Sequence, residues 1–588
     1  MVAQPGDTTR DDAHRADVVI VGGGIAGCVA ALRAAEAGAS VLVLDKTRSI
    51  RRSGDAGRGL AFLTTYLGLG EDWDTPEAFA EWYVTIGEGL VDMEVAWPLA
   101  ITPLPAVCAL LSDVGVPLRP VGAEYERTQR MWTPGPIVVK FDGADIKPRL
   151  SERVLATPGI TVRGGVHVTS VLTDDAGRAA TVTGFDVRTG AFVQADGAAI
   201  VLATGNAERV LYNSPRRDPF NTYHVPYHGA TGFAVAARAG ATLANVEFLG
   251  TFLFPRGFAS GAMGNLMEAG GRLVNGNGDL VASTPDVPTD RRFGHGLIGK
   301  AAGEVLAGRG PIYIDCTGLG ADVQADLRTY LPYDAPLFLE FLDQSGIDLA
   351  RNPVEFELFN GAWSATGSPK GVVVDGRAET GVPGLFAAGD MATPVYALAG
   401  SLTSGWVAGA EAARDALADG RASGRTGATA PAVQAERERV FGPLRGRTSA
   451  SIGWQEYERE LQEVVTRYVG MDRNANGLRQ AGHYLADYRA AADDVRAGDW
   501  HELMRAHEAF DLCVFDQLMT AAAAERDETR FNFVLGHRRS DRPEADDATW
   551  KGVAVTVTDA DGGPRTQRTV PTPWWREREL ARPAGPVA

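Results

Sequence analysis

The sequence predicts an α/β protein whose central domain is assembled from segments far apart in the chain. Three apolar stretches that end in small residues support this prediction: residues 17–46, 199–205 and 384–390. Each stretch has the pattern of a buried strand that runs into glycine or alanine, where a backbone can come close to a ligand. The chain has 588 residues, which is long enough for several domains.

The first stretch carries the most specific motif. Apolar residues 18–21 precede a G-x-G-x-x-G turn made by Gly22, Gly24 and Gly27, and a second apolar run ends at Asp45. In a dinucleotide-binding unit the first glycine makes the tight turn, the second admits the pyrophosphate, and the third allows close helix–strand packing. An acid about twenty residues further on accepts from a ribose hydroxyl. An ordinary α/β turn does not require that acid, so dinucleotide binding is the favoured interpretation.

The two later stretches indicate which dinucleotide binds. Residues 199–205 read AIVLATG, and residues 384–390 read GLFAAGD and are followed by an alanine-rich helix. We expect Asp390 to hold a ribityl hydroxyl or the pyrophosphate region. The amides at the start of the helix are expected to face the isoalloxazine carbonyls. An N-terminal dinucleotide turn completed by a C-terminal strand of this kind is the organisation of FAD enzymes.

Further motifs support a family resemblance. They are Asp45-Lys46, Arg52-Ser53-Gly54, Gly59-Leu60, and the runs 142–148, 219–224, 245–248, 254–256 and 537–543. On these residues the chain resembles the flavoprotein subunits of the succinate dehydrogenase/fumarate reductase superfamily. Within that superfamily it is most similar to the α subunit of dissimilatory adenylylsulfate reductase.

The resemblance implies an α/β fold with a Rossmann-like FAD-binding domain in discontinuous segments, an inserted α+β capping domain and a C-terminal helical domain. The expected boundaries are residues 16–240 and 366–425 for the FAD-binding domain, 241–365 for the capping domain, 432–540 for the helical domain, and 541–588 for a C-terminal tail. Apolar side chains at helical spacing between residues 457 and 468 independently predict a helix there.

The motif and the resemblance together imply the residues that contact FAD. They are Gly22, Gly24, Ile25, Ala26, Gly27, Asp45, Lys46, Ser53, Gly54, Gly59, Val168, Ala203, Thr204, Gly205, Asp390, Ser401 and Leu402. Many quinone-linked relatives anchor FAD covalently through a histidine just before the flavin-facing loop. Residues 48–58 contain no histidine, so noncovalent FAD is expected.

The chain departs from relatives that act on dicarboxylates. Those enzymes place a His-Pro pattern after a Glu-Phe pair, and here Phe252 fills the histidine position. They also carry a proton-donating arginine, where this chain offers His295 with arginines just before it. Succinate or fumarate chemistry, the oxidation or reduction of a C–C bond, is therefore the second expectation.

The first expectation is an adenylylsulfate reductase-like reaction, in which a small anionic substrate reacts at flavin N5. Such chemistry needs fixed cations more than an acid–base relay. The candidate catalytic residues are Arg256 as a cation over the flavin, His224 for anion binding or proton transfer, and His295. Arg256 also fits a surface turn, and His224 also fits a structural role. A third expectation is an electron-transferring subunit that depends on a partner, such as an iron–sulfur protein.

Composition narrows the remaining classes. A net charge of −17 argues against nucleic-acid binding, which needs a basic face. No uninterrupted apolar run approaches the length of about eighteen residues that a membrane helix needs, and the polar start lacks the core of a signal peptide. We therefore expect a cytoplasmic enzyme. Four scattered cysteines without C-x-x-C spacing predict no iron–sulfur cluster, no zinc and no other metal in this chain.

Overall fold

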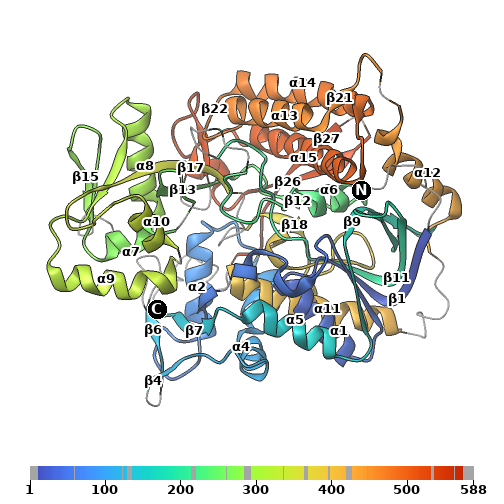
Figure 1. The fold of residues 1–588 in the computed structure, drawn as a ribbon, viewed down its shortest axis with the longest axis horizontal. Helices are drawn as coiled ribbons and strands as arrows, with labels where there is room; N and C mark the ends of the chain where they lie inside the picture. Colours follow the sequence, from blue (N-terminus) through green and yellow to red (C-terminus); the bar gives the residue numbers. More distant parts are fainter. Residues whose placement is uncertain are drawn as a thin grey trace, which may run out of the picture.

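The computed structural model describes most of the chain. It covers residues 11–573 except 59, 122–123, 129–134, 214–216, 218–219, 260, 284–292, 336, 363–368, 395–396, 419–426, 447, 532–535 and 562. Figure 1 shows one lobe made of segments from both ends of the chain, a second lobe from its middle, and a group of helices from its C-terminal part.

The largest sheet in the described residues has seven strands and is built from three distant segments. In spatial order they are β8 (Ile160–Gly164), β2 (Val41–Asp45), β1 (Asp11–Val21), β11 (Phe192–Leu202), β10 (Ala179–Asp186) and β9 (Val166–Thr173), with β19 (Leu385–Ala387) also paired to β11. β8, β2, β1, β11 and β19 run parallel, as the pairing of Ile200 with Leu385 illustrates. Their carboxyl ends therefore meet at one edge of the sheet. This arrangement confirms the predicted α/β fold in discontinuous segments.

Two helices of small residues cover this sheet (Figure 1). They are α1 (Ile25–Glu36), which follows the glycine turn, and α11 (Ala397–Leu417). They pack closely because glycines of α11 lie against alanines of α1. A Cβ atom at Gly409 would stand 2.2 Å from the carbonyl oxygen of Ala30. The two small-residue helices that the sequence predicted are therefore present, and they pack against each other and against the sheet.

The middle of the chain forms an antiparallel sheet with its own core. In spatial order its strands are β13 (Gly250–Pro255), β17 (Val354–Ala362), β16 (Ile312–Asp315), β14 (Arg272–Val274) and β15 (Leu280–Ser283). Its helices are α7 (Met263–Glu268), α8 (Phe293–Leu306), α9 (Ala321–Asp334) and α10 (Phe338–Gln344). This α+β lobe lies to the left in Figure 1 and confirms the expected inserted domain.

Long helices form the C-terminal region. α13 (Trp454–Tyr468), α14 (Ala475–Ala491) and α15 (Trp500–Glu525) pack on one another, and α15 also contacts α6 (Thr231–Arg238) of the first lobe. Most of α15 is buried, including charged side chains such as Glu508. The helical domain expected from the resemblance is therefore present and packs directly on the FAD-binding part.

Part of the segment that we expected to be a tail is folded into a sheet. β26 (Ala554–Ala560) and β27 (Gly563–Thr569) form a hairpin, and β26 pairs with β12 (Leu243–Ala244). Alternation explains the difference, because Val555 and Val557 are fully buried on one face of β26. The C-terminal hairpin thus forms one side of a five-stranded sheet whose other strands are β12, β18 (Gly371–Val373) and β20 (Ala392–Thr393).

The segment Met93–Asp113 has the length and hydropathy of a membrane span, although sequence inspection found no such run. Its helical window is 44% buried in the fold, and Leu99, Val107 and Leu111 are core residues. Core helices of this kind pass the same test of length and composition.

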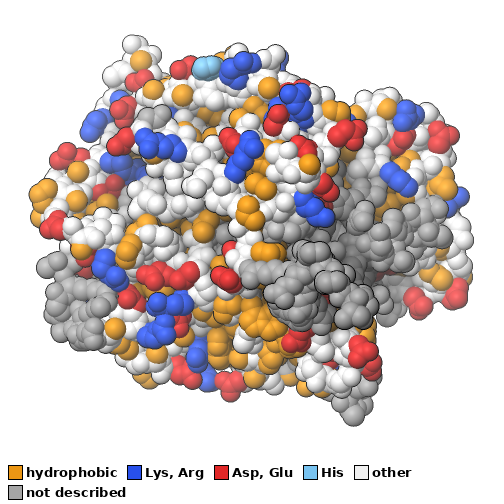
Figure 2. All heavy atoms as spheres, turned by 180° about the vertical axis from the view of Figure 1, so that it is seen from behind, with side chains coloured by type: hydrophobic (Ala, Val, Ile, Leu, Met, Phe, Trp, Pro, Cys, Tyr) orange, Lys and Arg blue, Asp and Glu red, His pale blue; other side chains and the backbone are white. Residues whose placement is uncertain are grey.

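On the face drawn in Figure 2, acidic and basic side chains are interspersed with hydrophobic ones.

Candidate functional site

A cavity of about 810 Å³ lies where the carboxyl edge of the large sheet meets the α+β lobe. Its wall includes many of the residues named from sequence: Gly22, Gly24, Ile25, Ala26, Asp45, Lys46, Ser53, Gly54, Val168, Ala203, Thr204, Gly205, Asp390 and Ser401. Gly27 and Leu402 lie behind the wall, and Leu402 is fully buried in a core. Gly59 falls outside the described residues.

The three motif glycines have different roles. A Cβ atom at Gly22 would stand 2.3 Å from the carbonyl oxygen of Ala203, and one at Gly27 would stand 1.9 Å from the carbonyl oxygen of Gly22. Both glycines are therefore required by the packing of the protein itself. At Gly24, a Cβ atom would meet no described atom within 4 Å. Gly24 opens onto the cavity at the start of α1, where helix amides favour an anion, so the turn fits the pyrophosphate of FAD.

Asp45 stands at the end of β2 and holds the glycine turn as well as facing the cavity. Its side chain accepts a hydrogen bond from the backbone amide of Gly23 at 2.6 Å and one from the amide of Thr47 at 2.7 Å. Oδ1 also accepts a hydrogen bond from the Thr47 hydroxyl, so the second lone pair of Oδ2 is the one to which a ribose hydroxyl can donate. The position fits the sugar of an adenosine.

Lys46 is held by α15. Its Nζ lies 2.6 Å from Oε1 of the buried Glu508, which also pairs with Arg209 at 2.9 Å and with Arg505. Burial alone would raise the pKa of Glu508, but the three cations hold it far below its usual range. Lys46 therefore joins the FAD-binding part to the helical region, and it shares the Glu508 carboxylate with two arginines.

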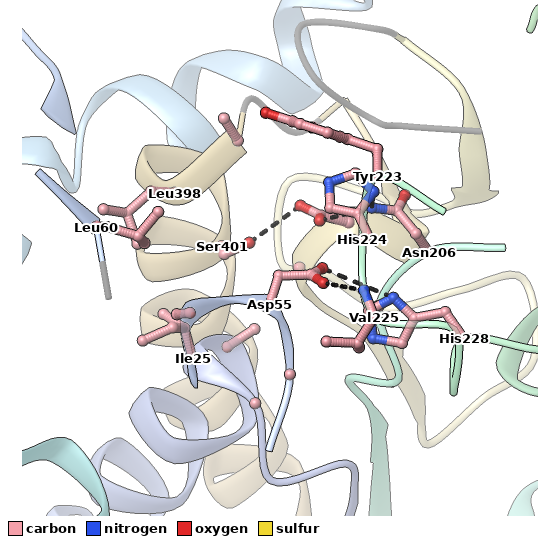
Figure 3. Close-up of a pocket in the computed structure, with 18 of the residues that line it drawn as sticks. Ile25, Asp55, Leu60, Asn206, Tyr223, His224, Val225, His228, Leu398 and Ser401 are labelled. Carbon is pink, nitrogen blue, oxygen red and sulfur yellow. Dashed lines mark hydrogen bonds and ion pairs between the residues drawn. The ribbon is translucent and has the colours of Figure 1, made fainter. Parts of the chain in front are cut away.

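His224 lies in the wall opposite Ile25 and Leu60 (Figure 3), with the buried carboxylate of Glu208 behind it. His224 Nδ1 is 2.7 Å from Oε1 of Glu208, and the His224 side chain is only 9% exposed. Burial alone would lower the pKa of His224, but the carboxylates of Asp55, Glu208 and Asp390 raise it to about 9. The imidazole is therefore protonated at neutral pH.

Asp390 and Asp55 flank this histidine from different loops. Asp390 accepts a hydrogen bond from the Asn206 side chain at 2.9 Å and another from Ser401 Oγ at 3.2 Å. Burial raises the pKa of Asp390. Asp55 accepts from the amide of Val225 at 2.8 Å. Donor atoms of Asp55, His224 and Asp390 lie within 4.8 Å of one another, a spacing that a metal ion could bridge. The protonated imidazole opposes metal coordination.

Sequence reasoning missed Asp55, Asn206 and Glu208. Asp55 directly follows the Ser53-Gly54 match, and Asn206 directly follows the Ala-Thr-Gly segment that ends at Gly205. Polar residues immediately after such motifs were the available signal. Glu208 carried no signal of its own, because only the fold brings it against His224.

Aromatic rings form the wall of the cavity on the side of the α+β lobe. Phe252 and Phe254 lie two residues apart on β13 and therefore share a face, with ring centroids 5.3 Å apart and planes within 5°. Tyr223 packs on both rings, at 5.7 Å from Phe252 and 5.1 Å from Phe254. Figure 3 shows Tyr223 beside His224 at this end of the cavity.

The structure contradicts the expected role of Arg256. Its side chain is 61% exposed, pairs with Glu355 at 3.1 Å and does not line the cavity. β13 ends at Pro255, and the turn that follows carries Arg256 outward to solvent. His295 lies in the first turn of α8, and its side chain falls outside the described part of the structure.

Comparison with known proteins agrees with this architecture. The family profile described as "FAD binding domain" matches residues 17–403, and that described as "Fumarate reductase flavoprotein C-term" matches residues 458–574. The chain is 29% identical to an L-aspartate oxidase of Streptomyces coelicolor, over 93% of this chain and 92% of that protein. It is 26% identical to an L-aspartate oxidase of Mycobacterium leprae, over 81% and 85% of the two chains.

Solved structures show the same fold. Adenylylsulfate reductase from Archaeoglobus fulgidus superimposes with a TM-score of 0.83 at 20% identity, covering 96% of this chain and 97% of that one. The E. coli quinol fumarate reductase flavoprotein superimposes with a TM-score of 0.78 at 20% identity, covering 95% and 97%. The curated sequence relatives are named L-aspartate oxidase, so sequence similarity does not favour adenylylsulfate reductase activity over other activities of the superfamily. The chain belongs to the FAD-dependent oxidoreductases of the succinate dehydrogenase/fumarate reductase flavoprotein superfamily.

Proposed function

We propose that this chain oxidises or reduces a small organic acid at a carbon atom, and that His224 donates or accepts the proton in this reaction. The observation that carries the proposal is the His224–Glu208 pair in the wall of the cavity that also contains the Gly24 turn. FAD, when bound, supplies the hydride acceptor or donor. Gly24, Asp45, Asp390 and Ser401 are the residues we expect to hold it.

His224 suits proton transfer for two reasons. Its Nδ1 is engaged by Glu208, which fixes the orientation of the ring and leaves Nε2 as the second proton-bearing atom. The surrounding carboxylates raise the pKa of His224, against the effect of burial, so the ring carries a transferable proton at neutral pH. In the reducing direction the protonated His224 donates this proton to the substrate. In the oxidising direction only the deprotonated ring can accept a proton, and its fraction grows as the pH rises toward 9.

An adenylylsulfate reductase-like reaction has less support from the described wall. Sulfite and an adenosine phosphate both need fixed cations. The basic side chains that line the cavity are Lys46, Arg119, His167, His224 and His228. Lys46 shares Glu508 with Arg209 and Arg505, and Arg119 lies 3.5 Å from Glu126, so neither cation is unpaired where sulfite and a phosphate must be held together. Burial holds the pKa of His167 well below its usual value, so this side chain is neutral.

Oxidation of an amino acid is the second candidate function. The curated relatives named L-aspartate oxidase favour it, because they align over most of both chains. The carboxylates of Asp55 and Asp390 line this part of the cavity beside the His224 ring, and the buried Glu208 lies behind it. A substrate ammonium group is therefore better matched to this part of the cavity than a second carboxylate.

Anaerobic titration of the purified flavoprotein tests the proposal. Oxidised protein is mixed with amino acids and simple organic acids, and dithionite-reduced protein is mixed with their unsaturated counterparts, while flavin absorbance is followed. We expect an organic or amino acid to bleach or restore the flavin, and His224→Gln to slow that change. Bleaching only by sulfite with AMP, or only by a protein electron donor, would refute the proposal.

A further inference from the structure

The aromatic wall of the cavity points to the class of substrate. We propose that the site takes an organic acid that carries a planar aromatic ring, and that this ring packs on Tyr223 and Phe252. The inference rests on the proposed function and narrows it, because it selects aromatic acids over aliphatic dicarboxylates.

The three rings form one continuous surface. Phe252 and Phe254 are parallel on one face of β13, and the Tyr223 ring lies within 29° of Phe252 and 28° of Phe254. All three residues line the cavity. Phe254 is 2% exposed and packs on Phe359 at 4.7 Å, so it anchors the group. Tyr223 and Phe252 are only partly buried and present ring surface to the cavity.

The rings do not belong to the main cores. Phe254 and Phe359 form a small apolar cluster of their own, with Tyr223 and Phe252 packed at its margin. Side chains that merely fill a core are enclosed on all sides. Here two partly buried rings line a cavity, and aromatic side chains in such a position favour contact with another ring.

The neighbouring wall is also apolar and flat. Leu253, Phe258, Met263 and Ile298 line the same cavity, and Phe258 is held parallel to Phe341 at 4.8 Å. These four side chains offer a second carboxylate no hydrogen bond, so its burial against them is costly, and Asn265 is a described hydrogen-bond donor close to them in the lining. An aromatic ring is compatible with all of them.

Arg119 also lines the cavity and is suited to a single carboxylate. Arg119 lies 3.5 Å from Glu126, but Glu126 already accepts a hydrogen bond from Lys140 at 2.7 Å. Glu126 therefore keeps a cationic partner if the guanidinium turns to a ligand. Two classes of compound carry an aromatic ring and one carboxylate, and both are candidate substrates: simple aryl acids and aromatic amino acids.

Equilibrium binding to the FAD-loaded protein tests the inference. The probes are 3-phenylpropionate, 3-cyclohexylpropionate, L-phenylalanine and succinate, and flavin absorbance is the signal. We expect both aromatic probes to bind more tightly than succinate. The phenyl acid should bind roughly 2- to 10-fold more tightly than its cyclohexyl counterpart, the added value of ring stacking. Comparing phenylpropionate with phenylalanine then separates the two sources.

Variants of the aromatic wall test whether its rings cause the preference for the phenyl acid over the cyclohexyl acid. Phe252→Leu and Tyr223→Leu should remove the phenyl-over-cyclohexyl preference, while FAD content and melting temperature stay unchanged. Tyr484→Leu is the matched control, because Tyr484 is 42% exposed on α14 and does not line the cavity. If the variants lose FAD instead, the rings serve the cofactor and the inference fails. Tighter binding of succinate overturns the inference alone. Binding of none of the acids overturns both the inference and the proposed function.

Discussion

His224 Nδ1 lies 2.7 Å from Oε1 of Glu208, a carboxylate that is fully buried at the cavity wall. Within the described part of the chain, Oε2 of Glu208 has no hydrogen-bond partner. A buried carboxylate of this kind is stable beside a cation and costly without one. The Glu208 carboxylate therefore helps to hold His224 in its charged form, and this coupling gives two tests.

The first test changes Glu208 to glutamine. Glu208→Gln keeps the shape of the side chain but removes one of the negative charges that raise the pKa of His224. We expect that pKa to fall from about 9 by about 1 to 2 units. The limb of the pH–rate profile that reports on the protonated imidazole should move to lower pH by the same amount. An unchanged profile, with FAD retained, would show that Glu208 does not act through His224.

The second test measures stability against pH. The folded-state pKa of His224 is raised from 6.5 to about 9, so its contribution is complete below pH 6.5 and is lost as pH rises through 9. The shift corresponds to about 3 kcal/mol of unfolding free energy. We expect His224→Gln to destabilise the protein at pH 6 and to differ little from wild type near pH 10. Chemical denaturation at both pH values measures this, and the exposed His483→Gln variant is the control. A difference that does not vary with pH would contradict the assigned charge.

The glycine turn makes a separable prediction. A Cβ atom at Gly24 meets no described atom within 4 Å, and its φ of −66° is allowed for valine. We expect Gly24→Val to fold with a near-normal circular dichroism spectrum but to lose FAD, because the side chain fills the space for the pyrophosphate. Gly22→Val should instead impair folding, because its Cβ atom would stand 2.3 Å from Ala203 O. A yellow Gly24→Val protein after purification would contradict this reading of the turn.

Arg256 gives a prediction opposite to the one that the sequence suggested. A cation over the flavin would make Arg256→Ala cost turnover on the order of 10²-fold. In the structure the side chain is 61% exposed and forms a surface ion pair with Glu355. Such pairs contribute about 0 to 1 kcal/mol. We expect Arg256→Ala to change stability by less than that and to leave turnover within about twofold. A large loss of turnover would return Arg256 to the site.

The sequence predicted those parts of the site that are local in the chain. Asp45 ends a strand, and Gly24 and Asp390 each lie three residues beyond the end of one; strand ends of a parallel sheet meet at one edge. Glu208 was missed because its contact with His224 depends on how the loop after β11 folds back on itself. Arg256 was misplaced because motif matching carries no information on which side of a strand end faces solvent.

The mode of FAD attachment is a further prediction. Covalent attachment needs a neutral, nucleophilic imidazole facing the flavin ring. Residues 48–58 contain no histidine. Among the histidines that line the cavity, His224 is protonated because nearby carboxylates raise its pKa to about 9 against the effect of burial. His167 lies on β9 beside Val168, where we expect the adenine. We therefore predict noncovalent FAD. Acid precipitation should leave the flavin in the supernatant, and the denatured chain should show no flavin fluorescence on a gel. A fluorescent band that disappears in His228→Ala would identify His228 as an attachment point and contradict the prediction.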